Sequence, residues 1–276
     1  MNTTSSTSAI SKWIRETARE GHSIEDMIDM MLKSGYTARQ SRRLIAETLN
    51  RPGIAIPVAV KHPNGLRTRH PDPPAVEIDG RRIEVSTCVE TPTVRILEHF
   101  IDDDECAELI EQARPRLDRS RTVTDTGTNE VSTARTSSGM FFRLGETALI
   151  TRLENRIAEM VGIPVDHGEG LQILHYDPGQ EYEPHYDWFD PSQAGYKTLT
   201  AAGGERIATV ILYLNTPEGG GGTHFPRVGV TACARKGSAL YFAYENGDQS
   251  SLHAGLPVTK GEKWIATKWL RERPYR

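Results

Sequence analysis

The feature that most constrains the fold is a series of short apolar segments, separated by turns rich in Gly and Pro, that fills the sequence beyond Gly170. Apolar runs of about four to eight residues bounded by such turns are typical of strands. Many short strands in succession predict a β-sandwich or jelly roll with helices packed outside it. We expect strands at Leu171–Tyr176, Arg206–Leu214, Ala239–Tyr244 and Trp264–Leu270.

The segment before Gly170 adds further strands and two helices. Asp79-Gly80 separates two alternating runs, which predicts a hairpin because Gly tolerates a positive φ. Three aspartates precede an apolar helical period, where acids favour the positive end of the helix dipole. The predicted elements are strands at Val76–Ile78, Arg82–Val85 and Val94–Phe100, a helix that follows Asp102–Asp104, and a helix at Ala148–Val161. The fold class is therefore mainly β with flanking helices.

The first fifty residues have a different pattern, with apolar residues at helical spacing in three short stretches. Ser23-x-x-Asp26 and Thr37-x-x-Gln40 resemble capping boxes, which open helices. Residues 51–74 are rich in Pro, Gly, Arg and His and indicate a linker. We therefore expect a three-helix module at 1–50, the linker at 51–74 and a catalytic domain at 75–276.

Composition limits the class of partner and the location. The hydrophobic content of 37% and the charged content of 25% are ordinary for a globular protein. The net charge of −4 argues against nucleic acid and anionic lipid as partners. Cys88, Cys106 and Cys233 form no metal or disulfide pattern. Because the sequence also shows no apolar leader and no long apolar segment, we expect a cytoplasmic protein without a membrane partner.

The chemistry begins with the tripeptide His-x-Asp, which is the local mark of an iron site with two His ligands and one carboxylate. Nine His residues would give roughly half a match by chance, and this chain has three. His70 and Asp72 lie in the linker, which would not hold ligands rigidly. His175 and Asp177 run into a Pro-Gly turn, so Asp177 is better explained as a turn residue. His185 and Asp187 share one face of a predicted strand and are the best pair.

The third ligand and a cation for a co-substrate are predicted further along. His253 precedes a turn at Lys260-Gly261, and Lys263 follows on the return limb of a hairpin. Such a hairpin would bring Lys263 close to His253. An ammonium beside the metal is what a dicarboxylate needs when its other end chelates iron. Each residue alone has a plainer explanation, since His253 would be an ordinary strand residue and Lys263 a solvated charge.

An ordered series of motifs over residues 93–272 resembles the prolyl 4-hydroxylase family. The motifs are Arg135-Thr-Ser-Ser-Gly139-Met-Phe141, Tyr176-x-x-Gly179-Gln180-x-Tyr182-x-x-His185-x-Asp187, Arg206-x-x-Thr209 to Tyr213-Leu214-Asn215, Gly220-Gly221-x-Thr223-x-Phe225-Pro226, and His253-Ala-Gly255-x-Pro257 to Lys263-Trp264-x-x-Thr267-Lys268-Trp269. The resemblance implies a double-stranded β-helix, or jelly-roll, core. It also implies an enzyme that uses Fe(II), 2-oxoglutarate and O₂, with L-ascorbate as a further candidate cofactor.

Carried over residue by residue, the resemblance implies a role for nine positions. Those positions are His185, Asp187 and His253 for iron, Lys263, Tyr176 and Thr223 for 2-oxoglutarate, and Tyr182, Arg206 and Trp269 for the peptide substrate. One departure is that the family's usual Gly-Gly-Glu-Thr has Gly222 in place of the acid. The loop 190–204 before Arg206 is also long.

Several features have plainer alternatives. The aromatic candidates could be core residues. Trp269 shares strand parity with Lys263, whereas Trp264 does not, so Trp269 is the better pocket residue. The glycines at 219–222 do not form a phosphate loop, because no Lys-Ser/Thr follows them. Residues 121–134 are polar and rich in Thr, which suits either a lid over a peptide or an idle surface loop.

The sequence therefore predicts a hydroxylase that acts on peptidyl proline and releases succinate and CO₂. Two alternatives stay open. One is hydroxylation of a free amino acid or of another protein side chain. The other is a sensor or scaffold that binds a protein partner through residues 1–50, a segment whose turn at 33–37 resembles the helix-helix loop of ubiquitin-associated-type bundles.

Overall fold

A computed structural model describes residues 3–36, 38–49, 75–123, 129–131 and 134–275 of the chain. The chain forms two compact units, one built on the N-terminal helices and one that contains the described strands. The predicted linker, with His70 and Asp72, lies outside the described residues. Within the described part, no helix is both long and apolar enough to span a membrane.

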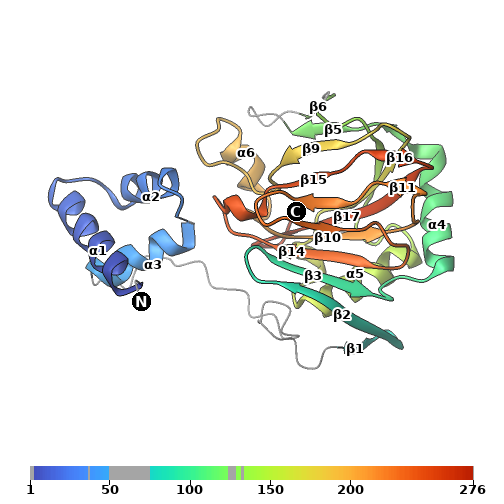
Figure 1. Ribbon diagram of the computed structural model, residues 1–276, viewed down its shortest axis with the longest axis horizontal. Coiled ribbons are helices and arrows are strands. Elements are labelled where there is room, and N and C mark those ends of the chain that lie inside the picture. The colour runs from blue at the N-terminus through green and yellow to red at the C-terminus, as the bar shows by residue number, and fades with distance from the viewer. Residues whose placement is uncertain (1–2, 37, 50–74, 124–128, 132–133, 276) are drawn as a thin grey trace. The chain divides into compact units, whose positions relative to one another are not determined.

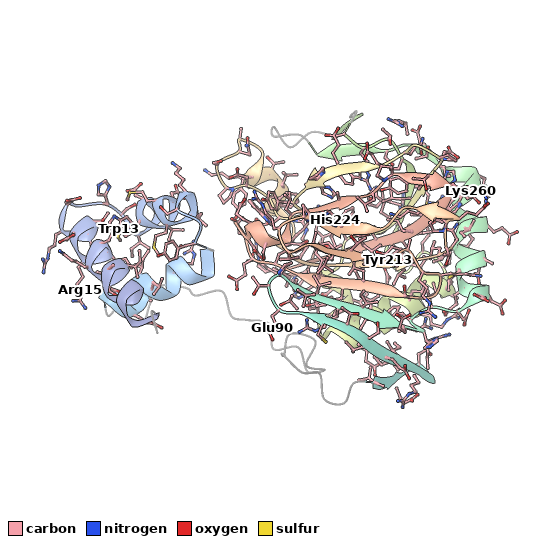
Figure 2. The ribbon with its side chains drawn as sticks, viewed as in Figure 1. Trp13, Arg15, Glu90, Tyr213, His224 and Lys260 are labelled. Carbon is pink, nitrogen blue, oxygen red and sulfur yellow. The ribbon has the colours of Figure 1, made fainter. Side chains whose placement is uncertain are left out.

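The N-terminal unit is a small bundle of three helices around one apolar cluster. The second helix begins with the predicted capping box, in which Asp26 N–H donates to Ser23 Oγ and Ser23 N–H donates to Asp26 Oδ2. The other predicted box includes Thr37, which is not among the described residues. The helices are α1 (Thr3–Arg19), α2 (Ile24–Lys33) and α3 (Ala38–Leu49), and their buried core residues are Ile14, Met27, Ile28, Met31 and Ile45. Figure 2 labels Trp13, which packs against this cluster.

The second unit is dominated by an antiparallel sheet of nine strands. Its central strands are the ones that the sequence predicts beyond residue 170, with ends that differ by one residue or so from the predicted ones. In spatial order the strands are β1 (Ala75–Ile78), β2 (Arg81–Val89), β3 (Thr93–Glu98), β14 (Ala239–Ala243), β10 (Arg206–Tyr213), β17 (Lys263–Arg271), β8 (Leu171–Tyr176), β7 (Ser138–Phe142) and β4 (Asp118–Arg119).

A smaller sheet packs against the large one through a shared apolar cluster. Figure 1 labels two of its strands, β9 and β15. Its strands, in order, are β13 (Val230–Ala232), β12 (Thr223–Phe225), β15 (His253–Gly255) and β9 (Tyr182–His185). Apolar side chains from both sheets fill the space between them, among them Leu240, Phe242 and Ile265 from the large sheet and Phe225 from the small one. This arrangement confirms the predicted jelly-roll core. Two short ladders complete the sheets, namely β11 (Gly219–Gly220) with β16 (Val258–Lys260) and β5 (Arg121–Val123) with β6 (Asn129–Val131).

Two helices cover the outer face of the large sheet. Helix α4 (Asp103–Ala113) begins at Asp102, whose side chain accepts the N–H of Glu105 in a second capping box. Helix α5 (Ala148–Val161) has the predicted bounds and ends at Gly162, which adopts a left-handed φ of 69°. Their apolar faces join the outward residues of the sheet in a single core. The remaining helices are α6 (Tyr196–Ala201) and the 3₁₀ turns η1 (Arg114–Arg116), η2 (Val165–His167) and η3 (Gln249–Ser251).

The two faces of β17 have different surroundings because side chains alternate along a strand. Trp264 belongs to the outer core beneath the helices, whereas Ile265 belongs to the cluster between the sheets. Lys263 and Trp269 have the parity of Ile265 and therefore face the smaller sheet. The sequence prediction that Trp264 and Trp269 lie on opposite faces is correct.

The structure also corrects the sequence analysis in two places. Lys263 is not on the return limb of a hairpin with His253, because β16 lies between them and pairs with β11, while β15 and β17 belong to different sheets. The long loop 190–204 contains a short helix, α6. The predicted lid at 121–134 includes the β5–β6 ladder and residues outside the described part, so its closing over a substrate stays a prediction.

Candidate active site

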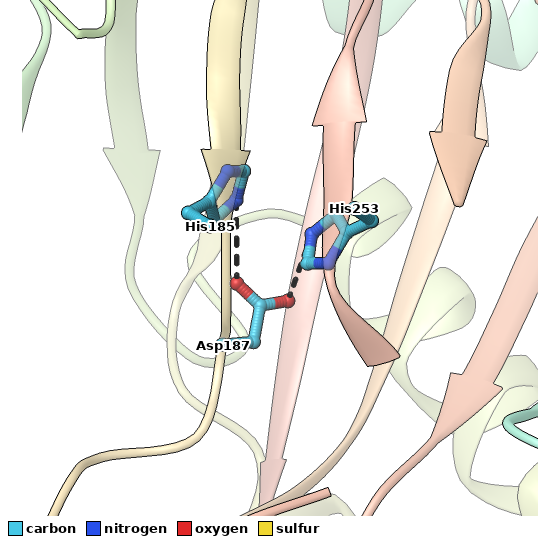
Figure 3. A group of neighbouring side chains, drawn as sticks. All are labelled: His185, Asp187 and His253. Atoms are coloured by element: carbon cyan, nitrogen blue, oxygen red, sulfur yellow. Dashed lines mark ion pairs between the residues drawn. The ribbon is translucent and has the colours of Figure 1, made fainter. Parts of the chain in front are cut away.

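The candidate site lies at the end of the β9–β15 ladder, where two histidines are cross-strand partners. His185 ends β9 and His253 begins β15, and the two are paired in register. Asp187 follows His185 by two residues and places its carboxylate between the rings (Figure 3). Asp187 Oδ1 lies 3.8 Å from His185 Nε2, and Oδ2 lies 3.7 Å from His253 Nε2. Among the described residues, this is the one group of three such side chains whose ligand atoms lie within 4.8 Å of one another.

Both imidazole rings are held in the orientation that a metal ligand needs. His185 Nδ1 donates to the carbonyl oxygen of Glu183 at 2.7 Å, and His253 Nδ1 donates to that of Ser251 at 3.0 Å. A carbonyl oxygen only accepts, so each Nδ1 carries a proton, and in the neutral form of such a ring the free lone pair is on Nε2. A hydrogen bond of this kind fixes the tautomer and the ring plane of a metal-binding histidine.

The electrostatics favour the protonation states that bind a divalent cation. Burial, followed by the neighbouring His253, lowers the pKa of His185 to about 3, so the ring is neutral near pH 7. Burial would raise the pKa of Asp187, but His253, His185 and Arg206 lower it more strongly. The carboxylate therefore stays ionised. Neutral imidazoles and an ionised carboxylate are the states in which these groups bind metals.

Lys263 lies on the inner face of the large sheet at the start of β17. Its side chain is 1% exposed, and burial lowers its pKa to about 8. Its Nζ lies over the ring of Tyr176, 5.0 Å from the centroid, and 3.9 Å from the position that a Cβ on Gly255 of β15 would take. In the described part of the chain no carboxylate pairs with it. Lys260, by contrast, is exposed and pairs with Glu218. Figure 2 labels Lys260.

Tyr176 and Thr223 are both buried close to this lysine. Tyr176 is the cross-strand partner of Lys263 on β8. Thr223 begins β12 and accepts a hydrogen bond of 2.9 Å from the phenol of Tyr213. Because the Thr223 oxygen accepts from Tyr213, its own proton is available to another acceptor. Thr223 also pairs across β12 and β15 with Gly255, the residue that Lys263 Nζ approaches, so the three residues predicted for the co-substrate lie near one another between the sheets.

The three residues predicted for the substrate surround the histidine and carboxylate group. Tyr182 stacks on His185, with ring centroids 3.5 Å apart. Arg206 lies over the ring of Trp269 at 4.1 Å and forms a bidentate pair with Glu169, with N–O distances of 2.6 and 2.9 Å. Glu169 also pairs with Arg271 at 2.7 Å, so the two arginines share one carboxylate. Burial leaves Trp269 Nε1 without a hydrogen-bond partner among the described atoms.

Arg135 also adjoins the site, although the sequence analysis gave it no role. It is buried, its guanidinium lies 4.9 Å from the Tyr182 ring centroid, and its Nη2 donates to Gln172 at 3.0 Å. It begins the Arg135-Thr-Ser-Ser-Gly139 motif, which was noted only as part of a resemblance. A single arginine before a run of small polar residues would have been the only local signal.

The other His-x-Asp pair, His175 and Asp177, lies away from the site. Gly222, which replaces the acid usual in the family, has a steric reason. His175 lies against Trp264 beneath the outer helices, and its Nε2 lies 2.8 Å from Glu262 Oε2. A Cβ on Gly222 would lie 2.8 Å from Cγ2 of Thr231 and 3.1 Å from the carbonyl oxygen of Ala232. Strand β13 therefore occupies the space that an acidic side chain would need at position 222.

Comparison with known proteins gives the class. Residues 171–271 match the model of the 2OG-Fe(II) oxygenase superfamily. A probable prolyl 4-hydroxylase 10 of Arabidopsis thaliana is 41% identical over 209 residues, which cover 67% of this chain and 71% of that protein. Prolyl 4-hydroxylase 5 of the same plant is 38% identical, with 67% and 70% covered.

A solved structure extends this likeness to the fold. The viral collagen prolyl hydroxylase of Paramecium Bursaria Chlorella virus-1, in its 2OG complex, aligns with a TM-score of 0.53 and 30% identity over 64% of this chain and 95% of that one. Fold and site together define an Fe(II)- and 2-oxoglutarate-dependent dioxygenase, which also uses O₂. Within that class, the chain belongs to the prolyl 4-hydroxylase family.

Proposed function

We propose that this chain hydroxylates peptidyl proline, with Fe(II) bound by His185, Asp187 and His253. The observation that carries the proposal is the presence of two buried features between the same two sheets. One is the group of two imidazoles around an ionised carboxylate, in which burial keeps the His185 ring neutral by lowering its pKa. The other is a buried lysine for which the described residues supply no acid. When bound, iron and 2-oxoglutarate would supply the chemistry by which O₂ is split between the two substrates, one oxygen atom hydroxylating a C–H bond and the other entering succinate as CO₂ is released.

Lys263 is proposed to bind the distal carboxylate of 2-oxoglutarate, with Tyr176 and Thr223 beside it. Burial removes the water that would otherwise compete for the anion, so a charge-assisted hydrogen bond is strong here. The proton of the Thr223 hydroxyl is free for the same carboxylate, because its oxygen already accepts from Tyr213. The protein's part is to hold the co-substrate in one orientation within a region that excludes water.

Tyr182, Arg206 and Trp269 are proposed to position the peptide. Tyr182 stacks on His185, and Arg206, which donates to the carbonyl oxygen of Asp187, stacks on Trp269, so flat side chains adjoin two of the three proposed ligands. Such surfaces suit the ring of a proline. The relatives support this substrate, since those with printed roles are prolyl 4-hydroxylases and a viral collagen prolyl hydroxylase.

The test is succinate release with a panel of proline-containing peptides, each matched by the same peptide with Ala in place of Pro. We expect release with the proline peptides alone, and mass spectrometry should locate the added oxygen on proline. Succinate release with free amino acids and with none of the peptides would reject peptidyl proline as the substrate. An absence of release with every compound would favour the partner-binding role of residues 1–50.

Three further properties are proposed from the sequence. A cytoplasmic location is supported by the three widely spaced cysteines, and ascorbate as a reductant is supported by the family resemblance. Residues 1–50 are proposed to be dispensable for the chemistry, which is supported by the position of every proposed site residue beyond the Pro-rich linker.

A further inference from the structure

The carboxylate of Asp187 is held by a buried chain of two hydroxyl groups. Thr209 Oγ1 donates to Asp187 Oδ2 at 2.6 Å, and the Thr209 oxygen lies 2.8 Å from the phenol oxygen of Tyr244. Thr209 and Tyr244 are 1% and 3% exposed. The three residues lie far apart in the sequence and come from three elements, with Asp187 after β9, Thr209 on β10 and Tyr244 directly after β14.

The direction of the two hydrogen bonds follows from the donors and acceptors available. An ionised carboxylate can only accept, so the bond to Asp187 uses the single proton of the Thr209 hydroxyl. Thr209 can then meet Tyr244 only as an acceptor. The phenol of Tyr244 is therefore the donor, and both protons point toward the carboxylate.

The sheet places these groups together. Thr209 pairs with Phe242 across β10 and β14, and Tyr244 N–H donates to the carbonyl oxygen of Ile207 at 3.1 Å, so the ladder continues past the end of β14. Alternation then puts Phe242 and Tyr244 on the face that carries Thr209. Phe242 packs against the ring of His253 at 4.7 Å. One strand end therefore supports a histidine directly and the carboxylate through Thr209.

We propose that Thr209 and Tyr244 are positioning residues that fix the Asp187 carboxylate for the metal. The inference rests on the proposed function, because it takes Asp187 as a ligand. A carboxylate that is free to rotate loses orientational freedom when it binds a cation. The hydroxyl chain removes that freedom in advance and occupies one lone pair of Oδ2. Loss of a group that orients a metal ligand typically weakens metal binding about 10- to 100-fold.

The experiment is anaerobic titration of the full chain with Co(II), followed by its visible absorption, which reports ligand geometry without turnover. The variants are Thr209→Val, Thr209→Ser, Tyr244→Phe and Asp187→Ala. Tyr241→Phe is the matched control, since Tyr241 lies on the opposite face of β14 in the outer core. Circular dichroism identifies variants that do not fold.

We expect Thr209→Val to weaken Co(II) binding at least about tenfold and to change the absorption bands. Thr209→Ser keeps the hydroxyl and should bind within about twofold of the parent. Tyr244→Phe should weaken binding by a smaller factor, roughly two- to fivefold, because Thr209 still reaches the carboxylate. Tyr241→Phe should match the parent.

An error about the hydroxyl chain and an error about the proposed metal site give different results. If Asp187→Ala binds Co(II) as the parent does, Asp187 is not a ligand and the proposed function fails. If Asp187→Ala abolishes binding while Thr209→Val and Tyr244→Phe bind normally, Asp187 is a ligand but Thr209 and Tyr244 do not position it. Should Thr209→Val not fold, the comparison of Tyr244→Phe with Tyr241→Phe decides, and equal affinities reject the proposal.

Discussion

The two faces of β17 carry one buried lysine each, and the two lysines have different environments. On the outer face, Lys268 Nζ lies 2.6 Å from Glu154 Oε1, and both side chains are almost fully buried. On the inner face, Lys263 is equally buried but has no acidic partner among the described residues. Burial lowers the pKa of both, and Glu154 opposes that effect only at Lys268.

This comparison separates a charge that serves the fold from one that serves a ligand. A buried charge without a partner costs free energy, so it is retained only when something else compensates. The outer lysine is neutralised by the protein itself. The inner lysine is left to be neutralised by an anion from solution, as the proposed co-substrate would do.

The side chains between the two sheets should carry all of the chemistry. Replacing His185, Asp187 or His253 by Ala should abolish turnover and weaken Fe(II) binding, because each removes a proposed ligand. His175→Ala removes a histidine from the outer side of the large sheet, away from the proposed ligands, and should leave turnover intact. Succinate release and anaerobic metal titration check both. Loss of iron with His175→Ala and not with His185→Ala would mean that the wrong pair had been chosen.

The outer lysine should matter for stability and not for catalysis. Lys268→Ala leaves Glu154 buried and unpaired, which typically costs about 3–5 kcal/mol of unfolding free energy. The 2-oxoglutarate concentration for half-saturation should not change below the unfolding temperature. Urea unfolding followed by fluorescence measures the loss. Replacing both residues by apolar ones, as in Lys268→Met with Glu154→Leu, should recover much of it, and no recovery would contradict the account of a neutralised structural pair.

The inner lysine should show the opposite behaviour. A charge-assisted hydrogen bond is worth about 1.5–3 kcal/mol, so Lys263→Ala should raise the half-saturating 2-oxoglutarate concentration at least about tenfold. Iron affinity should change little. Lys260→Ala is the matched control and should behave like the parent, and Lys263→Arg should recover part of the loss. An unchanged half-saturating 2-oxoglutarate concentration in Lys263→Ala would reject Lys263 as the residue that binds the distal carboxylate.

The lowered pKa of Lys263 predicts a pH dependence for the co-substrate. The folded pKa of about 8 lies below the usual value of 10.5, so the ammonium is present below about pH 8 and lost above it. Since the dicarboxylate pairs with the ammonium, half-saturation should rise about tenfold between roughly pH 7 and pH 9. Lys263→Met has no such group, and its half-saturation should lack this rise. Parallel curves for the two proteins would show that another group titrates.

The smallest effect is expected from removing the N-terminal helices. A chain that begins at Pro74 keeps every proposed site residue and should still consume 2-oxoglutarate in the presence of Fe(II). Turnover within about twofold of the full chain is expected, because loss of a separate unit leaves the core contacts of the other intact. A soluble, iron-loaded truncation without turnover would show that residues 1–73 complete the site.

Local pattern was enough to predict most of the fold. Alternation along β17 assigned Trp264 and Trp269 to opposite faces, and the Gly and Pro turns marked the strand ends, because both signals depend on a few neighbouring residues. The helix within residues 190–204 was missed because its six residues lack an apolar period long enough to recognise.

Long-range partners could not be predicted in the same way. The placement of Lys263 near Gly255 was expected from a hairpin, whereas the structure achieves it by bringing two sheets face to face. Arg206 was assigned to a substrate without its ion-pair partner Glu169, which lies 37 residues away. The contact between Thr209 and Tyr244 depends on the register of β10 with β14, which no local pattern specifies.

The cross-strand pairing of His185 with His253 has a mechanical consequence. Strand β9 is the last strand of the smaller sheet, and it is joined to β15 by a short ladder with an irregular register. A cation with one ligand on each strand would cross-link them and would add its binding free energy to the stability of the folded state. The same ion would then hold the edge of the smaller sheet together, so that local unfolding of a metal-free chain would begin where β9 meets β15.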